Sequence, residues 1–318
     1  MNWRRTPRET LVQEPEKSDG ESESPSFWDK KGMVGGVGGE YVSVMGTVQL
    51  SSKISATPLK AALGCVVEGV ELSGLSDSAL AEVGEALLPM WDEHLVLFFP
   101  GLSPSPADQV RFAKCFGNHF AATTDAGGDN RSAPSLADEG FPEILVLDTA
   151  NERFDPRVTA NWHTDVTFAA NPPKASLFCM EIAAVNGGNT MWSSQISAHS
   201  ALSQSFKDLI ADKKAVHGRP PLTNTNVHPM VRDHHATGKR ALFVNRGWTN
   251  SIVGLTSAES RHVLDALFET AEKPEHQIRW VWTSGDVALW DNRYTMHYAL
   301  NDYAGQRRRA RRVTIYDI

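Results

Sequence analysis

The pattern of apolar and polar positions predicts a few helices and many short strands. Residues 76–88 carry apolar side chains at helical spacing, and a second helix is expected from Ser105 and Pro106 to about Gly117. The apolar run 94–99 ends at a Pro-Gly pair, which predicts a buried strand. Two further helices are expected over 197–211 and 257–271.

Six more apolar runs have the length of buried strands, namely 144–147, 175–180, 241–244, 278–282, 287–290 and 312–315. Turns and insertions separate most of them, so they indicate a closed or sandwich-like β core with helices packed outside it. Residues 121–140 are rich in Gly, Asp and Ser and predict a long loop. Residues 1–50 are rich in Glu, Ser, Pro, Lys and Gly and predict a disordered tail, which leaves one domain over 51–318.

Composition narrows the class of protein. The 318 residues are 41% hydrophobic and 22% charged, which is typical of a globular chain, and no apolar run has the roughly 18 residues that a membrane span needs. Cys65, Cys115 and Cys179 are too few and too far apart for a disulfide framework, and no secretory signal is recognisable, so a cytoplasmic location is expected. The net charge of −7 argues against a general nucleic-acid binder, although the basic cluster 307–312 keeps that alternative open.

His163 and Asp165 form the only His-x-Asp pair in the chain. In an extended backbone these two side chains would point to one face and could bind a metal ion together, although such a pair is often only hydrogen-bonded. His297, which follows the apolar run 287–290, is the best candidate for a third ligand. Two histidines and a carboxylate are the ligand set of non-haem Fe(II) oxygenases.

The other histidines considered are interpreted as lying in polar loops or on exposed helix faces, and the His-His pair at 234–235 lacks the spacing of a zinc site. They are His199, His217, His228, His234, His235, His262 and His276.

Two arginines near the carboxyl end are candidates for binding an anion. In a strand, Arg308 and Arg312 would share one face, and Arg309 and Arg311 the other. A buried guanidinium needs an anion, and its planar shape suits a carboxylate. The alternative is a solvated basic edge strand or a patch for a polyanion.

Several segments resemble the taurine dioxygenase (TauD/TfdA) family of Fe(II)- and 2-oxoglutarate-dependent enzymes, in the right order from about residue 55 to the end. They are 161–168 (NWHTDVTF), 187–192 (GGNTMW), 228–232 (HPMVR) with Thr237-Gly238, 242–247 (LFVNRG), 290–293 (WDNR), His297-Tyr298-Ala299 and 312–314 (RVT). The resemblance implies an α+β fold with a double-stranded β-helix core, also called a jelly roll or cupin-like fold, and flanking helices.

The resemblance also implies roles for individual residues. His163, Asp165 and His297 match the iron ligands. Thr190 and Arg308 match the residues that hold the distal carboxylate of 2-oxoglutarate, and Trp290 matches an aromatic side chain beside it, although Trp290, like Trp280 and Trp282, also has the surroundings of a core residue. Arg312 matches the arginine that binds the acidic group of the substrate. Trp248 and Val166 match apolar contacts in the substrate site.

The departures from the family pattern lie on the substrate side. Ala122 stands where taurine users carry a histidine, with His119 as a candidate replacement, and Thr159 stands where they carry an asparagine. Taurine is therefore not indicated, whereas Arg312 favours a small anionic substrate.

The expected function is a dioxygenase that uses Fe(II), 2-oxoglutarate and O₂ to oxidise that substrate, by hydroxylation that can lead to C–S, C–O or C–N cleavage, with release of succinate and CO₂. The alternative is a non-catalytic jelly-roll protein that binds a small acid or a metal. No nucleic acid or membrane is expected as a partner. The oligomeric state is left open, a homo-oligomer included.

Overall fold

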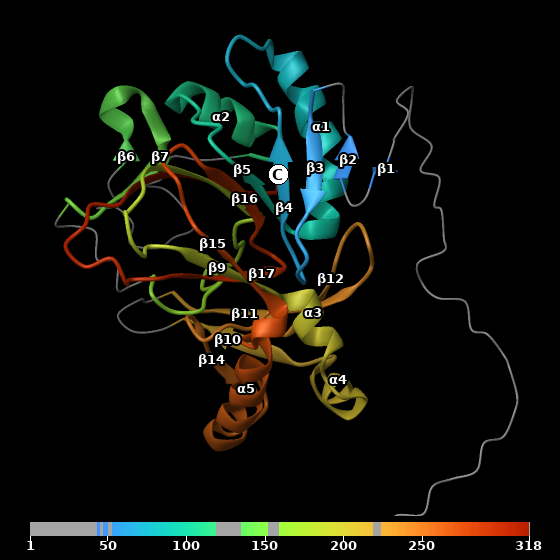
Figure 1. Cartoon of the computed structure of the whole chain (residues 1–318). Coiled ribbons are helices and arrows are strands. Elements are labelled where there is room, and N and C mark those ends of the chain that lie inside the picture. Colours follow the sequence, from blue (N-terminus) through green and yellow to red (C-terminus); the bar gives the residue numbers. More distant parts are fainter. Residues whose placement is uncertain are drawn as a thin grey trace, which may run out of the picture. The chain divides into compact units, whose positions relative to one another are not determined.

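The computed structural model describes residues 43–44, 47–49, 53–118, 135–151, 159–218 and 224–317. A ten-stranded sheet dominates them (Figure 1). In spatial order its strands are β1 (Ser43–Val44), β2 (Thr47–Gln49), β3 (Ser55–Pro58), β4 (Cys65–Glu68), β5 (Val96–Phe99), β16 (Val287–Asp291), β8 (Ala175–Ile182), β18 (Arg309–Ile315), β7 (Phe141–Asp148) and β6 (Ser135–Leu136). All pairs are antiparallel except β4 with β5.

A smaller antiparallel sheet faces the first one. It has the order β15 (Gln277–Trp280), β9 (Thr190–Ser194) and β17 (Thr295–Ala299). Two further groups of strands complete the fold, β11 (Asn226–Pro229) with β10 (Lys214–His217) and β14 (Thr249–Ile252), and β12 (Val231–Asp233) with β13 (Arg240–Leu242). This arrangement agrees with the expected jelly-roll core.

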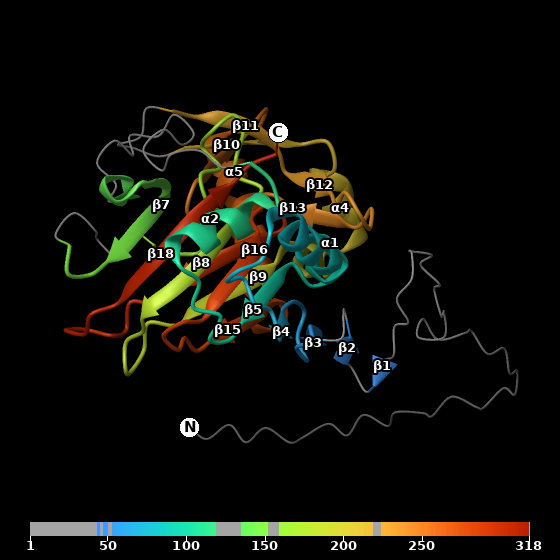
Figure 2. The ribbon, with the colours of Figure 1, turned by 90° about the horizontal axis from the view of Figure 1, so that it is seen from above.

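The helices lie outside the two facing sheets. Helices α1 (Asp77–His94) and α2 (Pro106–Lys114) cover the outer face of the large sheet, as the view from above shows (Figure 2). Helices α3 (Gln195–Ser200), α4 (Gln204–Ile210) and α5 (Ser257–Ala271) pack beyond the small sheet, and two short 3₁₀ helices are η2 (Ala137–Glu139) and η4 (Pro274–His276).

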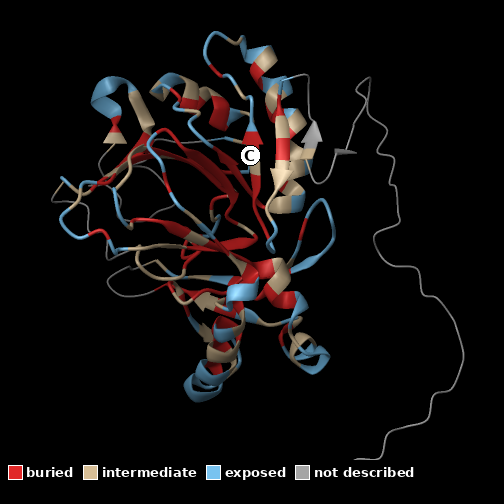
Figure 3. Ribbon diagram, viewed as in Figure 1, coloured by how far each residue is buried: buried red, intermediate tan, exposed pale blue. Residues whose placement is uncertain are grey.

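Side chains alternate between two cores along the central strands, because successive residues of a strand point to opposite faces. Leu177 and Leu289 pack outward against the helices, whereas Phe178 and Trp290 point inward toward Trp192 of the small sheet. The central strands are therefore buried on both faces (Figure 3). This explains why they appear in the sequence as continuous apolar runs.

Several predicted boundaries are wrong. Helix α1 does not end at residue 88 but continues through Pro89 to His94, so 94–95 is no strand, and Leu95 is the left-handed cap at φ 64°. The helix expected over 197–211 is two helices, because Ser203 caps a new one at its own start.

Other predicted segments need smaller corrections. Phe243 and Val244 lie beyond β13, and β6 and η2 occupy the end of the expected loop 121–140. The tail expected over 1–50 lies mostly outside the described residues, but β1 and β2 fall inside it, because β1 pairs with β2 and β2 pairs with β3. None of the described helices combines the length and the apolar character that crossing a bilayer requires.

Candidate metal centre and its cavity

The two histidines of the proposed site are neighbours across a backbone bridge. His163 N–H donates to His297 C=O at 3.0 Å, and His297 N–H donates to His163 C=O at 2.8 Å. In such an antiparallel pair the two side chains emerge on the same side. Gly247 packs directly against His163, and a larger residue would not fit there, because a Cβ on it would lie 2.6 Å from the Cβ of His163.

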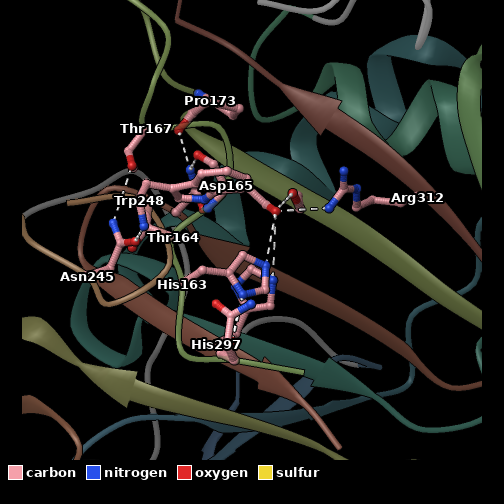
Figure 4. A network of polar contacts seen from close by, with 12 residues as sticks. His163, Thr164, Asp165, Thr167, Pro173, Asn245, Trp248, His297 and Arg312 are labelled. Carbon is pink, nitrogen blue, oxygen red and sulfur yellow. Dashed lines mark hydrogen bonds and ion pairs between the residues drawn. The ribbon is translucent and has the colours of Figure 1, made fainter. Parts of the chain in front are cut away.

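Asp165 reaches the histidines from a turn. The extended backbone expected over 163–165 is limited to the bridge at His163, and residues 165–168 form a turn in which Val166 has φ 55°. Asp165 Oδ1 nevertheless lies 3.7 Å from His163 Nε2 and 3.8 Å from His297 Nε2 (Figure 4). All three side chains are buried, and their ligand atoms lie within 4.8 Å of one another.

The protonation states of the three groups suit a metal ion. Burial lowers the pKa of His163 and lowers that of His297 to about 3, so both imidazoles are neutral near pH 7. His163 Nδ1 donates to Asn161 C=O at 2.8 Å, which leaves the lone pair on Nε2, the atom that faces Asp165. Burial would raise the pKa of Asp165, but Arg312 and then the two histidines hold it below its usual range.

This donor set fits a divalent metal of the iron type. Two neutral imidazole nitrogens and one carboxylate oxygen converge, and this combination leaves positions on one side of an ion for other ligands. The second carboxylate oxygen, Asp165 Oδ2, accepts from Ser176 Oγ at 3.3 Å, and Arg312 Nη1 donates to both oxygens at 3.1 Å. Ser176 and Arg312 thus fix the orientation of the carboxylate, and its Oδ1 faces the two imidazoles.

A cavity between the two sheets adjoins the three residues. Five of the predicted site residues, Thr159, Thr190, Trp290, Arg308 and Arg312, line it together with His297. The other lining residues are Leu147, Phe178, Trp192, Trp282 and Ala299.

Arg308 is the charged group at one end of this cavity. It is only 5% exposed, its Nε donates to Gly188 C=O at 3.0 Å, and no carboxylate in the described part of the chain pairs with it. Burial lowers its pKa to about 10, which still leaves it charged. Thr190 Oγ1 accepts from Trp282 Nε1 at 2.9 Å and keeps its own proton to donate. A buried cation beside a free hydroxyl fits the carboxylate of an acid such as 2-oxoglutarate.

The remaining predicted site residues are less central. Val166 and Trp248 do not line the cavity. Val166 belongs to the turn after Asp165, and Trp248 stacks edge-on against Phe168 with ring centroids 4.9 Å apart. His119 lies outside the described residues.

The basic cluster is largely neutralised within the fold. Strand β18 lies between β8 and β7, so the alternative of an edge strand is wrong. Arg308 and Arg312 point to the cavity, while Arg309 and Arg311 point outward and both pair with Glu181. Arg307 pairs with Asp148 at 2.7 Å.

The interpretation of the other histidines needs correction. His235 and His262 are exposed, but five of the seven are buried, because strands and turns far along the chain fold over them. The buried ones are His199, His217, His228, His234 and His276. His234 and His235 also lie near Asp92, and the potential ligand atoms of the three residues are within 4.8 Å of one another.

Two residues at the site cannot be identified from the sequence pattern. Trp282 has the surroundings of a core residue in the sequence, and its hydrogen bond to Thr190 joins residues that are far apart in the chain. Asn292 lies inside the segment 290–293 that resembles the family, but its side chain was assigned no role. The structure joins it to the turn that carries Asp165.

Comparison with known proteins supports one family. The family described as taurine catabolism dioxygenase TauD, TfdA family, matches residues 55–314. An alpha-ketoglutarate-dependent sulfate ester dioxygenase from Pseudomonas putida is 32% identical, over 86% of this chain and 93% of the relative. An alkylsulfatase from Acinetobacter baylyi is 31% identical, over 83% of this chain and 86% of the relative.

A solved structure gives the same result in three dimensions. The crystal structure of a taurine dioxygenase from Burkholderia xenovorans superposes with a TM-score of 0.69 at 33% identity. The match covers 84% of this chain and 92% of that one. The similarity therefore spans both sheets and the cavity between them.

Proposed function

The chain belongs to the TauD/TfdA family, and on that premise we propose that it oxidises a small organic sulfate ester at the cavity beside His163, Asp165 and His297. It is an Fe(II)- and 2-oxoglutarate-dependent dioxygenase. The observation that carries the proposal is a cavity lined by the buried Arg308, the partly buried Arg312 and His297, whose imidazole lies beside Asp165 and His163.

In this proposal His163, Asp165 and His297 bind the iron. When bound, the ferrous ion and 2-oxoglutarate use O₂ to put one oxygen atom into a C–H bond of the substrate, while the keto acid becomes succinate and CO₂. The protein holds the ligands in place and keeps water out. Both imidazoles are neutral, so no proton has to leave them before the metal binds.

Arg308, Thr190 and Trp290 bind 2-oxoglutarate. The guanidinium of Arg308 and the hydroxyl of Thr190 take the distal carboxylate, and the indole of Trp290, whose ring centroid lies 5.0 Å from that of His297, lines the cavity beside the co-substrate. Because Arg308 has no anion of its own in the described part of the chain, the co-substrate supplies the missing partner.

Arg312 binds the anionic group of the substrate. Its Nη1 donates a hydrogen bond to the carboxylate of Asp165. Its Nε is buried and has no hydrogen-bond partner among the described residues, so it can donate to a sulfate oxygen. Thr159 lines the same cavity, and Val166, Trp248 and His119 are assigned to the remaining substrate contacts by the family resemblance.

A sulfate ester accounts for the expected chemistry. Hydroxylation of the carbon that carries the ester oxygen gives an unstable product, which breaks the C–O bond to leave an aldehyde and inorganic sulfate. Two of the relatives that are more than 30% identical to this chain are named for sulfate esters or alkyl sulfates. The free thiols of Cys65, Cys115 and Cys179 support the further proposal of a cytoplasmic location.

The test is a panel of alkyl sulfates, sulfonates including taurine, and aryloxy acids, supplied with Fe(II), 2-oxoglutarate and air. We expect succinate in step with sulfate and aldehyde for an alkyl sulfate, and none from a His163→Ala variant. Succinate coupled only to a sulfonate or an aryloxy acid would contradict the substrate class. No succinate with any compound would contradict the proposed site and favour a non-catalytic binding protein.

A further inference from the structure

The turn that carries Asp165 holds an unfavourable backbone conformation. Val166 has φ 55°, a left-handed value that β-branched residues rarely adopt. The turn closes with a hydrogen bond from Ala169 N–H to Val166 C=O at 3.0 Å. Such a conformation persists only where the surroundings hold it in place.

Asn292 is the side chain that holds the backbone of Asp165 at the start of this turn. Its Oδ1 accepts from Asp165 N–H at 2.8 Å, and its Nδ2 donates to Asp165 C=O and to Pro173 C=O, each at 3.0 Å. Its own backbone N–H donates to Lys174 C=O at 2.8 Å. One residue therefore fixes both ends of the segment from Asp165 to Lys174, and Figure 4 shows Asp165 and Pro173 within the same network.

The chemistry of these contacts is specific to an amide. One oxygen acceptor and two N–H donors are needed, which is what asparagine offers and what aspartate or leucine, similar in size, cannot supply. Asn292 is 0% exposed, so water cannot replace a lost contact. The loss of one of these hydrogen bonds would leave a buried backbone N–H or C=O group without a partner.

The position of Asn292 couples two of the three proposed ligands. It begins the connection from β16 of the large sheet to β17 of the small one, and His297 lies five residues further on in β17. The connection that leads to His297 is therefore hydrogen-bonded to the backbone of Asp165. The next residues stabilise this connection, because Thr295 Oγ1 donates to Asp291 C=O at 2.6 Å.

We propose that Asn292 is a positioning residue, which sets the carboxylate of Asp165 relative to His297 and so determines how tightly the site binds its metal. This inference rests on the proposed function, because it takes Asp165 and His297 as metal ligands. Asn292 itself touches neither metal nor substrate.

The experiment measures metal affinity directly and needs no turnover. Metal-free wild-type protein and the Asn292→Ala and Asn292→Asp variants are titrated with Co(II) under competition from a chromophoric chelator, and the ligand-field spectrum of bound Co(II) is recorded. Asn292→Asp keeps the volume and the acceptor for Asp165 N–H but removes both donations, so it remains informative if Asn292→Ala does not fold.

Gln109→Met is the matched control. Gln109 is also 0% exposed, and its Nε2 donates to two backbone carbonyls, Leu177 C=O and Arg311 C=O, both at 3.3 Å. It belongs to α2, outside the large sheet. Its loss should lower the Tm without changing the metal site.

We expect both Asn292 variants to bind Co(II) about 10- to 100-fold more weakly than wild type, with an altered spectrum, and Gln109→Met to bind within about threefold of wild type. Unchanged affinity and spectrum in the Asn292 variants, with only a lower Tm, would overturn the inference. Failure of the wild type to bind Co(II) would instead contradict the metal centre itself.

Discussion

The carboxylate of Asp165 lies between the polar side chains of the site. Arg312, His163 and His297 all face its carboxylate, and only the arginine is charged near pH 7. The carboxylate therefore remains ionised although it is buried. A divalent cation would bind to a ligand set that is already deprotonated and already assembled.

Arg308, directly before β18, and Arg312, within it, both line the cavity but have different surroundings. Arg312 pairs with Asp165, whereas Arg308 donates from Nε to a backbone carbonyl. Replacing Arg308 by Met should raise the KM for 2-oxoglutarate about 30-fold or more, because a buried charge-assisted contact is worth about 2 kcal/mol or more. Steady-state measurement of succinate against 2-oxoglutarate concentration checks this.

Arg312→Met is the matched variant at the other arginine of the cavity. It should impair use of the substrate while decarboxylation of 2-oxoglutarate without substrate continues. If the two variants raised the KM for 2-oxoglutarate equally, the roles given to the two arginines would be wrong.

The chemistry of single residues was readable from the sequence to different degrees. The shared orientation of Arg308 and Arg312 follows from spacing, because strand alternation places i and i+4 on one face. His163 and Asp165 lie side by side through the turn after His163, and not through the extended backbone that their spacing predicts. The burial of His217 and His228 cannot be predicted from the sequence in this way, because it comes from Phe243 and from the turn at 167–169. Such contacts are set by tertiary folding.

At the scale of elements, apolar runs between strong turn signals were predicted well. Strand β16 and helix α5 begin where expected, and Thr256 caps α5 with a reciprocal hydrogen bond to Glu259. The errors fall where a local signal is overridden by packing. The helix expected over 76–88 stops before Pro89, but Trp91, buried two residues further on, keeps α1 continuous against the large sheet.

The pairing of strands could not be predicted from the pattern of residues alone. Strands β16 and β17 are separated by three residues yet belong to different sheets, since β16 pairs with β5 and β8 whereas β17 pairs with β9. That change of sheet carries His297 across to meet His163. The sequence alone supported a closed β core, and the family resemblance was needed to name the jelly roll.

At the scale of the whole molecule, buried histidines make stability depend on pH. The pKa of His217 is lowered to about 3 by burial, with the charges of His228 and Arg232 adding to the effect. Between about 6.5, the value for an unfolded chain, and 3, the unfolded state binds a proton that the folded state does not. The free energy of unfolding should therefore fall as the pH is lowered through this window.

The expected size is up to about 1.4 kcal/mol per pH unit for each such histidine. Urea unfolding of the metal-free protein at pH values from 6.5 to 4.5 checks this, and a His217→Gln variant should show a shallower dependence. His262→Gln, at an exposed position on α5, serves as the control. An identical slope for wild type and His217→Gln would refute the contribution of His217.

The central claim is that His163, Asp165 and His297 bind one ferrous ion and leave one side of it open for 2-oxoglutarate. The most direct measurement is the visible absorption of the protein with Fe(II) and 2-oxoglutarate in the absence of air. The account predicts a weak charge-transfer band that saturates at one Fe(II) per chain and is lost in His163→Ala. A band that persists in that variant, or no band in the wild type, would contradict it.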